Sequence, residues 1–65
     1  MIPVKQKYPW HRTRRGECFF VPALDVRRVE LQGIRIAYRQ GIYHVKATPC
    51  IYKGLLGVMF KRYSP

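Results

Sequence analysis

The stretch Asp-Val-Arg-Arg-Val-Glu-Leu-Gln-Gly-Ile-Arg-Ile-Ala-Tyr-Arg-Gln-Gly, residues Asp25 to Gly41, decides the fold of this chain. It is long enough for several helical turns, and its apolar side chains recur with a helical period. That apolar side consists of Val26, Val29, Gly33, Ile36 and Ala37. Asp25 is a suitable N-cap, and Gly41 suits the left-handed residue that follows a helix. The sequence therefore predicts an amphipathic helix over residues 25–41.

The opposite side of this segment is basic. Arg28, Gln32, Arg35 and Arg39 recur at i, i+4, i+7 and i+11, so a helix places them in one stripe. A strand is the alternative, because apolar residues from Val29 to Tyr38 nearly alternate with polar ones. Gly33 interrupts that alternation and would require a bulge, whereas on the buried face of a helix it permits close approach to a sheet. We therefore favour the helix.

Charge is the dominant feature of the composition. Of 65 residues, 13 are Lys or Arg and 3 are Asp or Glu, which gives a net charge of +10, while the hydrophobic fraction of 48% is ordinary for a folded protein. A chain this short forms one small domain without room for an enclosed substrate cleft. The excess of cations predicts an anionic partner: nucleic acid foremost, or else an anionic membrane surface or an acidic protein.

The absence of membrane-spanning and signal-peptide features in the sequence bears on the location of the protein in the cell. It has no apolar run of the ~20 residues that span a membrane, and its first residues do not resemble a signal peptide. We therefore expect a cytoplasmic protein without membrane association. Cys18 and Cys50 are too few for a disulfide framework, and we expect both to be small buried apolar residues.

The rest of the chain divides into a basic N-terminal arm, residues 1–15, and a single domain, residues 16–65. Prolines in the arm favour an extended segment over a regular element. Its Tyr8 and Trp10 either fold back over the core or contact a ligand, and the composition leaves both roles open. The arm is expected to be mobile unless bound.

Three strands are expected in the domain. Residues 17–21 form a short strand ended by Pro22, and its continuous apolar run after Glu17 predicts burial on both sides. Residues 42–53 form a second strand, which Pro49 assigns to a sheet edge. Gly54 and Gly57 bracket a turn around Leu55 and Leu56, and residues 58–63 form the third strand.

The order strand, helix, strand, strand predicts an α+β fold, a small βαββ domain. A crossover makes the first two strands parallel, and a hairpin makes the last two antiparallel. Prolines in the first two strands leave the third for the middle, so the sheet order is 1-3-2 with the helix on one face. The open face is then a binding surface or a homodimer interface. The expected core is Phe20, Val21, Val29, Ile36, Ala37, Val45, Ile51, Val58 and Phe60.

Several segments together resemble a group of short uncharacterised bacteriophage proteins. They are Tyr8-Pro9-Trp10, the strand motif Gly-Glu-Cys-Phe-Phe-Val-Pro of residues 16–22, and the closing residues 57–62. The sequence departs from that group at residues 11–14, His-Arg-Thr-Arg, where the group is often acidic or neutral. The resemblance implies a phage origin, and hence the cytoplasm of a host cell, but it implies no mechanism.

Residue types that support catalysis are scarce. The carboxylates are Glu17, Asp25 and Glu30, of which Asp25 is explained as a helix cap. The cysteines and the histidines His11 and His44 lack the close pairing of structural zinc motifs, and no glycine loop suits a nucleotide phosphate. We expect neither an enzyme nor a cofactor or metal.

Cations interleaved with aromatic residues indicate a nucleic-acid-binding protein, because phosphates attract cations and bases stack on rings. The expected contacts to DNA or RNA are Lys7, Trp10, Arg12, Arg14, Arg15, Arg28, Gln32, Arg35, Arg39, Lys46, Lys61 and Arg62. The alternative is a protein that inhibits a host or defence complex by occupying its nucleic-acid site. A third interpretation is that the aromatics only pack the core and the cations only solubilise the chain.

Overall fold

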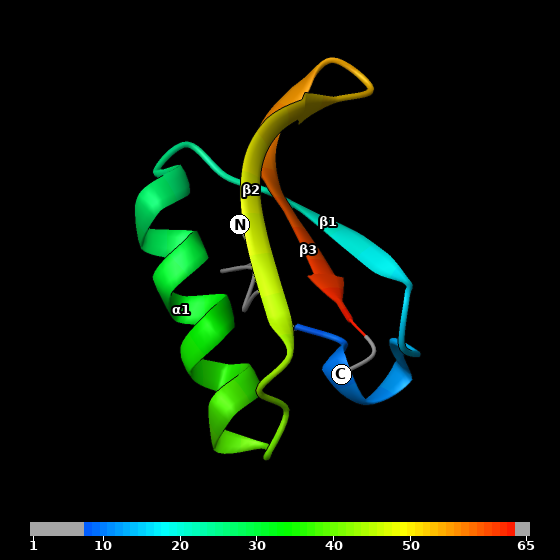
Figure 1. The fold of residues 1–65 in the computed structure, drawn as a ribbon. Helices are drawn as coiled ribbons and strands as arrows, with labels where there is room; N and C mark the ends of the chain where they lie inside the picture. The colour runs from blue at the N-terminus through cyan, green and yellow to red at the C-terminus, as the bar shows by residue number, and fades with distance from the viewer. Residues whose placement is uncertain (1–7, 64–65) are drawn as a thin grey trace, which may run out of the picture.

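The structure, a computed structural model, describes residues 8–63. Its elements are the 3-10 helix η1 (Trp10–Arg12), strand β1 (Cys18–Pro22), helix α1 (Val26–Arg39), and strands β2 (Val45–Tyr52) and β3 (Leu55–Arg62). Strand β3 lies between β1 and β2 and is antiparallel to both, and α1 covers one face of this sheet (Figure 1). The βαββ fold with sheet order 1-3-2 is therefore confirmed.

Both ends of α1 form as the sequence predicts. The Asp25 carboxylate accepts a hydrogen bond of 3.2 Å from the Arg28 amide at the amino end. At the carboxyl end Gln40 is the C-cap, and Gly41 has a φ of +80°, which glycine adopts without a steric penalty. The alternative of a bulged strand across this segment is wrong.

The hairpin that joins β2 to β3 is tighter than expected. It turns at Lys53 and Gly54, whose φ angles of +52° and +79° suit a two-residue turn that matches the twist of the strands. Leu55 and Leu56 belong to β3, so the turn predicted around them is wrong. Gly57 lies inside β3, where an added Cβ would meet the backbone of β1 and the Phe20 ring. Gly57 is therefore required by close packing and not by a turn.

An aromatic cluster fills the space between α1 and the sheet. Phe60 of β3 is fully buried at its centre, and its ring lies 5.7 Å from that of Trp10 and 5.3 Å from that of Phe19, between centroids. Tyr8 meets the Phe60 ring edge-on at 5.5 Å. Edge-on and offset aromatic pairs of this kind stabilise a core beyond the area that they bury.

The segment before β1 is part of this core. Trp10 is 0% exposed, and its indole Nε1 donates a hydrogen bond of 3.0 Å to the Gly33 carbonyl of α1. The Thr13 hydroxyl donates to the Pro9 carbonyl at 2.7 Å and holds the turn of η1 in place. Of the two roles left open for Tyr8 and Trp10, the structure has them folded over the core. Residues 1–7 of the expected arm lie outside the described residues.

The predicted core is correct in its centre and wrong at one end. Val21, Val29, Ala37, Val58 and Phe60 are buried, and Ile36 and Val45 pack partly buried against them. Ile51 is 72% exposed, because it lies near the hairpin tip, where no element covers it. Phe20 is half-buried, since its side chain points to the open face of the sheet. The buried residues that the prediction missed are Tyr8, Trp10 and Ile42.

The open face also corrects two expectations about β1 and the cysteines. Cys18 is exposed and Cys50 is half-buried, both as free thiols, because strands β1 and β2 are edges and no layer formed by residues 8–63 covers this side. For the same reason β1 is buried on one side only.

Gly33 sets the distance between α1 and the sheet, which makes it a sensitive position. A Cβ there would overlap the Phe60 ring and approach the Tyr8 ring at 3.1 Å. We expect Gly33→Ala to lower the free energy of unfolding by ~1–3 kcal/mol, although alanine improves helix propensity by about 1 kcal/mol. Urea denaturation measures this change.

The control for that variant is Phe60→Leu, which removes the ring that the new methyl group would meet. In the double variant the loss of stability should be smaller than the sum of the two single losses. If the two losses of unfolding free energy were additive, the destabilisation by Gly33→Ala would come from the backbone at position 33 and not from the contact of the new methyl group with Phe60.

Burial raises the pKa of the Tyr8 phenol above its ordinary value of 10.0. The folded chain thus holds this proton more tightly than the unfolded chain, so the stabilisation is complete below pH 10 and is lost as pH rises above it. We expect Tyr8→Phe to reduce the fall in unfolding free energy above pH 10. The comparison variant is Tyr38→Phe, at an exposed tyrosine. Identical alkaline profiles for wild type and Tyr8→Phe would contradict this assignment.

Candidate nucleic-acid interface

The outer face of α1 carries the predicted stripe of polar side chains. Arg28, Gln32, Arg35 and Arg39 are all exposed. With a rise of 1.5 Å per residue, the stripe extends over roughly 16 Å. Leu31 joins its first three members around a shallow hollow of about 320 Å³. The helix therefore presents a cationic surface that no other element of residues 8–63 covers.

The carboxylates of the chain do not neutralise this stripe. Asp25 accepts from the Arg28 amide and Glu17 accepts from the Arg14 amide at 2.8 Å, so both serve the backbone. Glu30 is half-buried and lines a groove of about 550 Å³ between α1 and β2, beside Arg35 and Lys46. Within residues 8–63, no ion pair joins one of these acids to an arginine or lysine.

A second group of cations gathers at the end of the molecule where α1 finishes. Arg12, Arg14 and Arg15 are exposed in the segment that leads into β1. This segment is tied to the end of β3, because the Gly16 amide donates to the Arg62 carbonyl at 2.6 Å. The half-buried Arg62 side chain donates from Nη1 to the Thr13 carbonyl at 3.0 Å.

The open face of the sheet holds the remaining predicted cations. Lys46 of β2, Lys61 of β3 and Cys18 of β1 are opposite one another in register, so both lysines lie side by side in one row. Farther along this face the rings of Phe20 and Tyr52 are in contact, with centroids 5.2 Å apart. Lysine beside aromatic rings on an exposed sheet is an arrangement that suits single-stranded nucleic acid.

Trp10 and Lys7 differ from the other predicted contact residues, Trp10 because it is buried and Lys7 because the structure does not describe it. Trp10 is enclosed by the aromatic cluster, so its ring has no free face on which a base could stack, and its assignment as a contact is corrected. Its place beside arginines in the sequence suggested a surface role, but in so small a fold the largest aromatic side chain is needed for the core. Lys7 lies outside the described residues.

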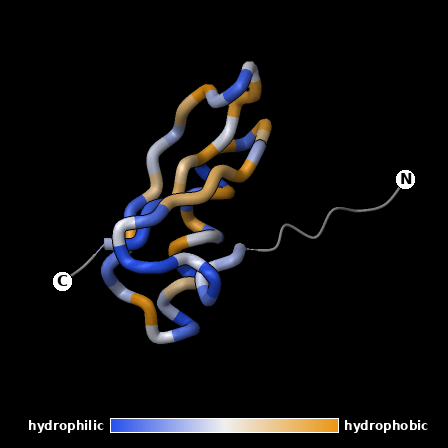
Figure 2. Tube along the Cα trace, turned by 90° about the vertical axis from the view of Figure 1, so that its right-hand side faces the viewer, coloured by the Kyte–Doolittle hydropathy of each residue, from blue (hydrophilic) through white to orange (hydrophobic). Residues whose placement is uncertain are grey.

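The opposite end of the molecule is apolar. The hairpin tip and the loop before α1 expose Leu24, Ile51, Tyr52, Leu55 and Leu56. Leu24 is 98% exposed, and its loop is joined to β3 by a hydrogen bond of 3.0 Å from the Ala23 amide to the Leu56 carbonyl. Figure 2 shows hydrophobic segments near the hairpin and a hydrophilic stretch at the other end. Exposed apolar side chains are thus grouped around the hairpin tip, although Leu31, Tyr38 and Tyr43 are also exposed on or just after α1.

Metal-binding clusters and membrane-spanning helices are both absent from the described part of the chain. Residues 8–63 contain no group of three His, Cys, Asp or Glu side chains able to hold a metal ion. No helix within that range has the length and apolar character to cross a membrane. In comparisons with known proteins, no family model, curated protein or solved structure matches this chain.

One set of residues was not assigned together from the sequence. Arg15 and Arg62 share a pocket with residues 41–44 and Tyr63, so the lining comes from three separate parts of the chain. Both arginines were expected to bind nucleic acid, but His44 was considered only as a metal ligand. No spacing in the sequence indicates this pocket, because it is assembled by the docking of residues 8–17 beside the end of β3.

Proposed function

We propose that this protein binds nucleic acid through the phosphate backbone, with the outer face of α1 as the main contact surface. The observation that carries the proposal is that Arg28, Arg35 and Arg39 project from one helix face, and that no carboxylate within residues 8–63 is paired with them. Unpaired cations concentrated on a single surface are expected to attract a polyanion rather than merely to keep the chain in solution.

The dimensions of the stripe support the same function. A length of roughly 16 Å covers two to three phosphate spacings along one strand and is comparable with the width of a major groove. All three cations are arginines, whose planar guanidinium groups make paired hydrogen bonds with phosphate oxygens or guanine edges. Lys46 and Lys61 on the open sheet face, and the arginines near η1, extend the positive surface around the molecule.

Binding is expected to depend steeply on salt. Neutralising five to eight phosphates gives a log-log slope of roughly −4.5 to −7 for duplex DNA, because bound counterions are released. Fluorescence anisotropy with a labelled duplex and a labelled single strand, titrated between about 50 and 200 mM salt, measures this slope. Absence of binding to DNA and RNA at the lowest salt would exclude the proposal and leave the alternative, a protein partner with an acidic surface.

The helix face is tested with two variants of equal charge. Arg35→Gln with Arg39→Gln removes two cations of the stripe, and Arg27→Gln with Lys53→Asn removes two exposed cations outside it. Asparagine is chosen at position 53 because it tolerates the positive φ of that residue. We expect the stripe variant to weaken binding about tenfold more than the control, at unchanged circular dichroism.

Equal losses in the two variants would show that net charge alone attracts the nucleic acid. In that case the assignment of the contact surface to α1 would be wrong, although nucleic-acid binding itself would stand.

A further inference from the structure

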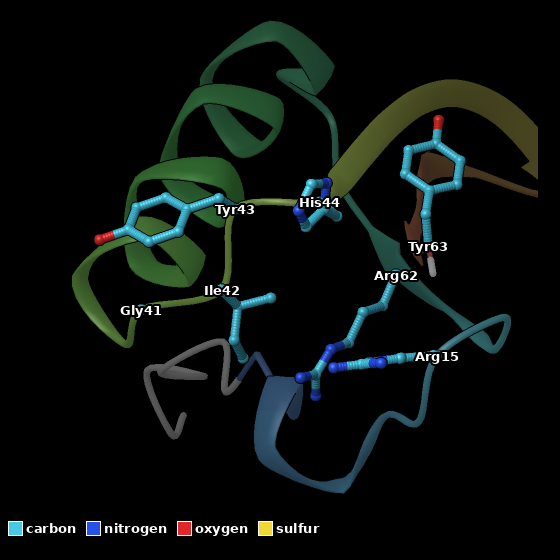
Figure 3. A pocket seen from close by; sticks show the side chains of 7 residues that line it. All are labelled: Arg15, Gly41, Ile42, Tyr43, His44, Arg62 and Tyr63. Atoms are coloured by element: carbon cyan, nitrogen blue, oxygen red, sulfur yellow. The ribbon is translucent and has the colours of Figure 1, made fainter. Parts of the chain in front are cut away.

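A pocket of about 280 Å³ lies at the end of the molecule where α1 finishes. Its walls are the loop after α1, residues 41–44, together with Arg15, Arg62 and Tyr63. The Tyr63 amide donates to the His44 carbonyl at 2.8 Å and joins this loop to the chain beyond β3. Figure 3 shows the Arg15 and Arg62 side chains reaching toward one another at the pocket, with His44 across from them and both tyrosine phenols directed away.

Backbone contacts hold both arginines at this pocket. Arg62 is fixed by the hydrogen bond of its guanidinium to the Thr13 carbonyl and by the bond of its amide to the Glu17 carbonyl at 3.0 Å. Arg15 occupies the corner of a turn that the Glu17 amide closes on the Arg14 carbonyl at 3.0 Å. Gly16 supplies the positive φ, +88°, that the following position of this turn requires.

Within residues 8–63, the charges in the pocket are not balanced by an acidic group. No carboxylate of these residues lines it, and Glu17, the acid nearest to Arg15 in sequence, accepts a hydrogen bond from the Arg14 amide. Two neighbouring guanidinium groups repel each other. An anion bound between them attracts both groups and offsets this repulsion. Two planar forks with a histidine opposite match the several oxygens of a phosphate group.

We infer that this pocket binds a terminal phosphate of a nucleic-acid strand, a deduction that rests on the nucleic-acid binding proposed above. A terminal phosphate carries nearly two charges near neutral pH, whereas a phosphate within the strand carries one, so two neighbouring arginines favour the terminal group. The small volume also suits a phosphate with part of its sugar and does not suit a whole strand passing through.

The test compares short oligonucleotides of one sequence that end in a 5′-phosphate, a 3′-phosphate or hydroxyl groups alone. Wild-type protein should bind one phosphorylated form about tenfold more tightly than the unphosphorylated form in anisotropy competition. Arg15→Gln should abolish that preference. Arg14→Gln is the matched control, because it removes the same charge from the same turn but its side chain does not line the pocket.

Further variants and outcomes separate this inference from the proposed function. Arg62→Lys keeps the charge while losing the planar fork, and it should reduce the preference if its circular dichroism matches that of wild type. Oligonucleotides that bind without any preference for a phosphorylated end would overturn the pocket assignment and leave the function of α1 intact. Failure of all oligonucleotides to bind would overturn both. Binding of inorganic phosphate that is lost in Arg15→Gln, without any preference among oligonucleotide ends, would overturn the assignment to strand ends.

Discussion

The contact between Gly33 of α1 and the Phe60 ring of β3 is the constraint on which the rest of this structure depends. Because Gly33 has no side chain, the helix approaches the sheet closely enough for the ring to lie against its backbone. The same residue offers its carbonyl to the Trp10 indole, which brings the segment before β1 into the core. One helix covers β2 and β3, and Trp10 covers Phe19 on β1. In this chain of 65 residues a single helix does not cover the whole sheet, and the segment that contains Trp10 completes the core.

This packing also determines where the charges lie. Trp10 is followed directly by residues 11–15, which are rich in arginine, so its burial fixes the position of this basic segment. The segment then continues into β1 beside the end of β3, where Arg62 binds the Thr13 carbonyl. Arg15 and Arg62 thus meet because the segment that follows Trp10 is hydrogen-bonded to the end of β3. The arrangement of the aromatic core and the shape of the cationic surface are consequences of the same contact.

The sequence was sufficient to predict the fold because its signals are local. The 3.6-residue period, the cap at Asp25, and Gly41 after the helix specify α1, and the prolines in β1 and β2 assign both strands to the edges of the sheet. What it did not predict depends on contacts that are distant in the sequence. Ile51 appeared to be a core residue because of its β-branched side chain, but burial requires an element above it, and none reaches the hairpin tip. For Trp10, the charged neighbours left open whether the side chain joins the core or contacts a ligand.

The same distinction applies to the candidate sites. The stripe from Arg28 to Arg39 was predictable, since a helix of known register fixes the side chains on its outer face. The pocket of Arg15 and Arg62 was not, because it requires the position of the segment before β1 relative to the end of β3. These two surfaces also differ in their relation to folding. The side chains of Arg35 and Arg39 make no hydrogen bond to another residue of the described range 8–63, whereas the Arg62 guanidinium donates to the Thr13 carbonyl. Substitutions of the helix arginines can therefore change affinity without changing stability, whereas a substitution of Arg62 can change both. A loss of binding in an Arg62 variant is therefore compared with the loss in an Arg15 variant, because Arg15 lines the same pocket without the hydrogen bond to Thr13.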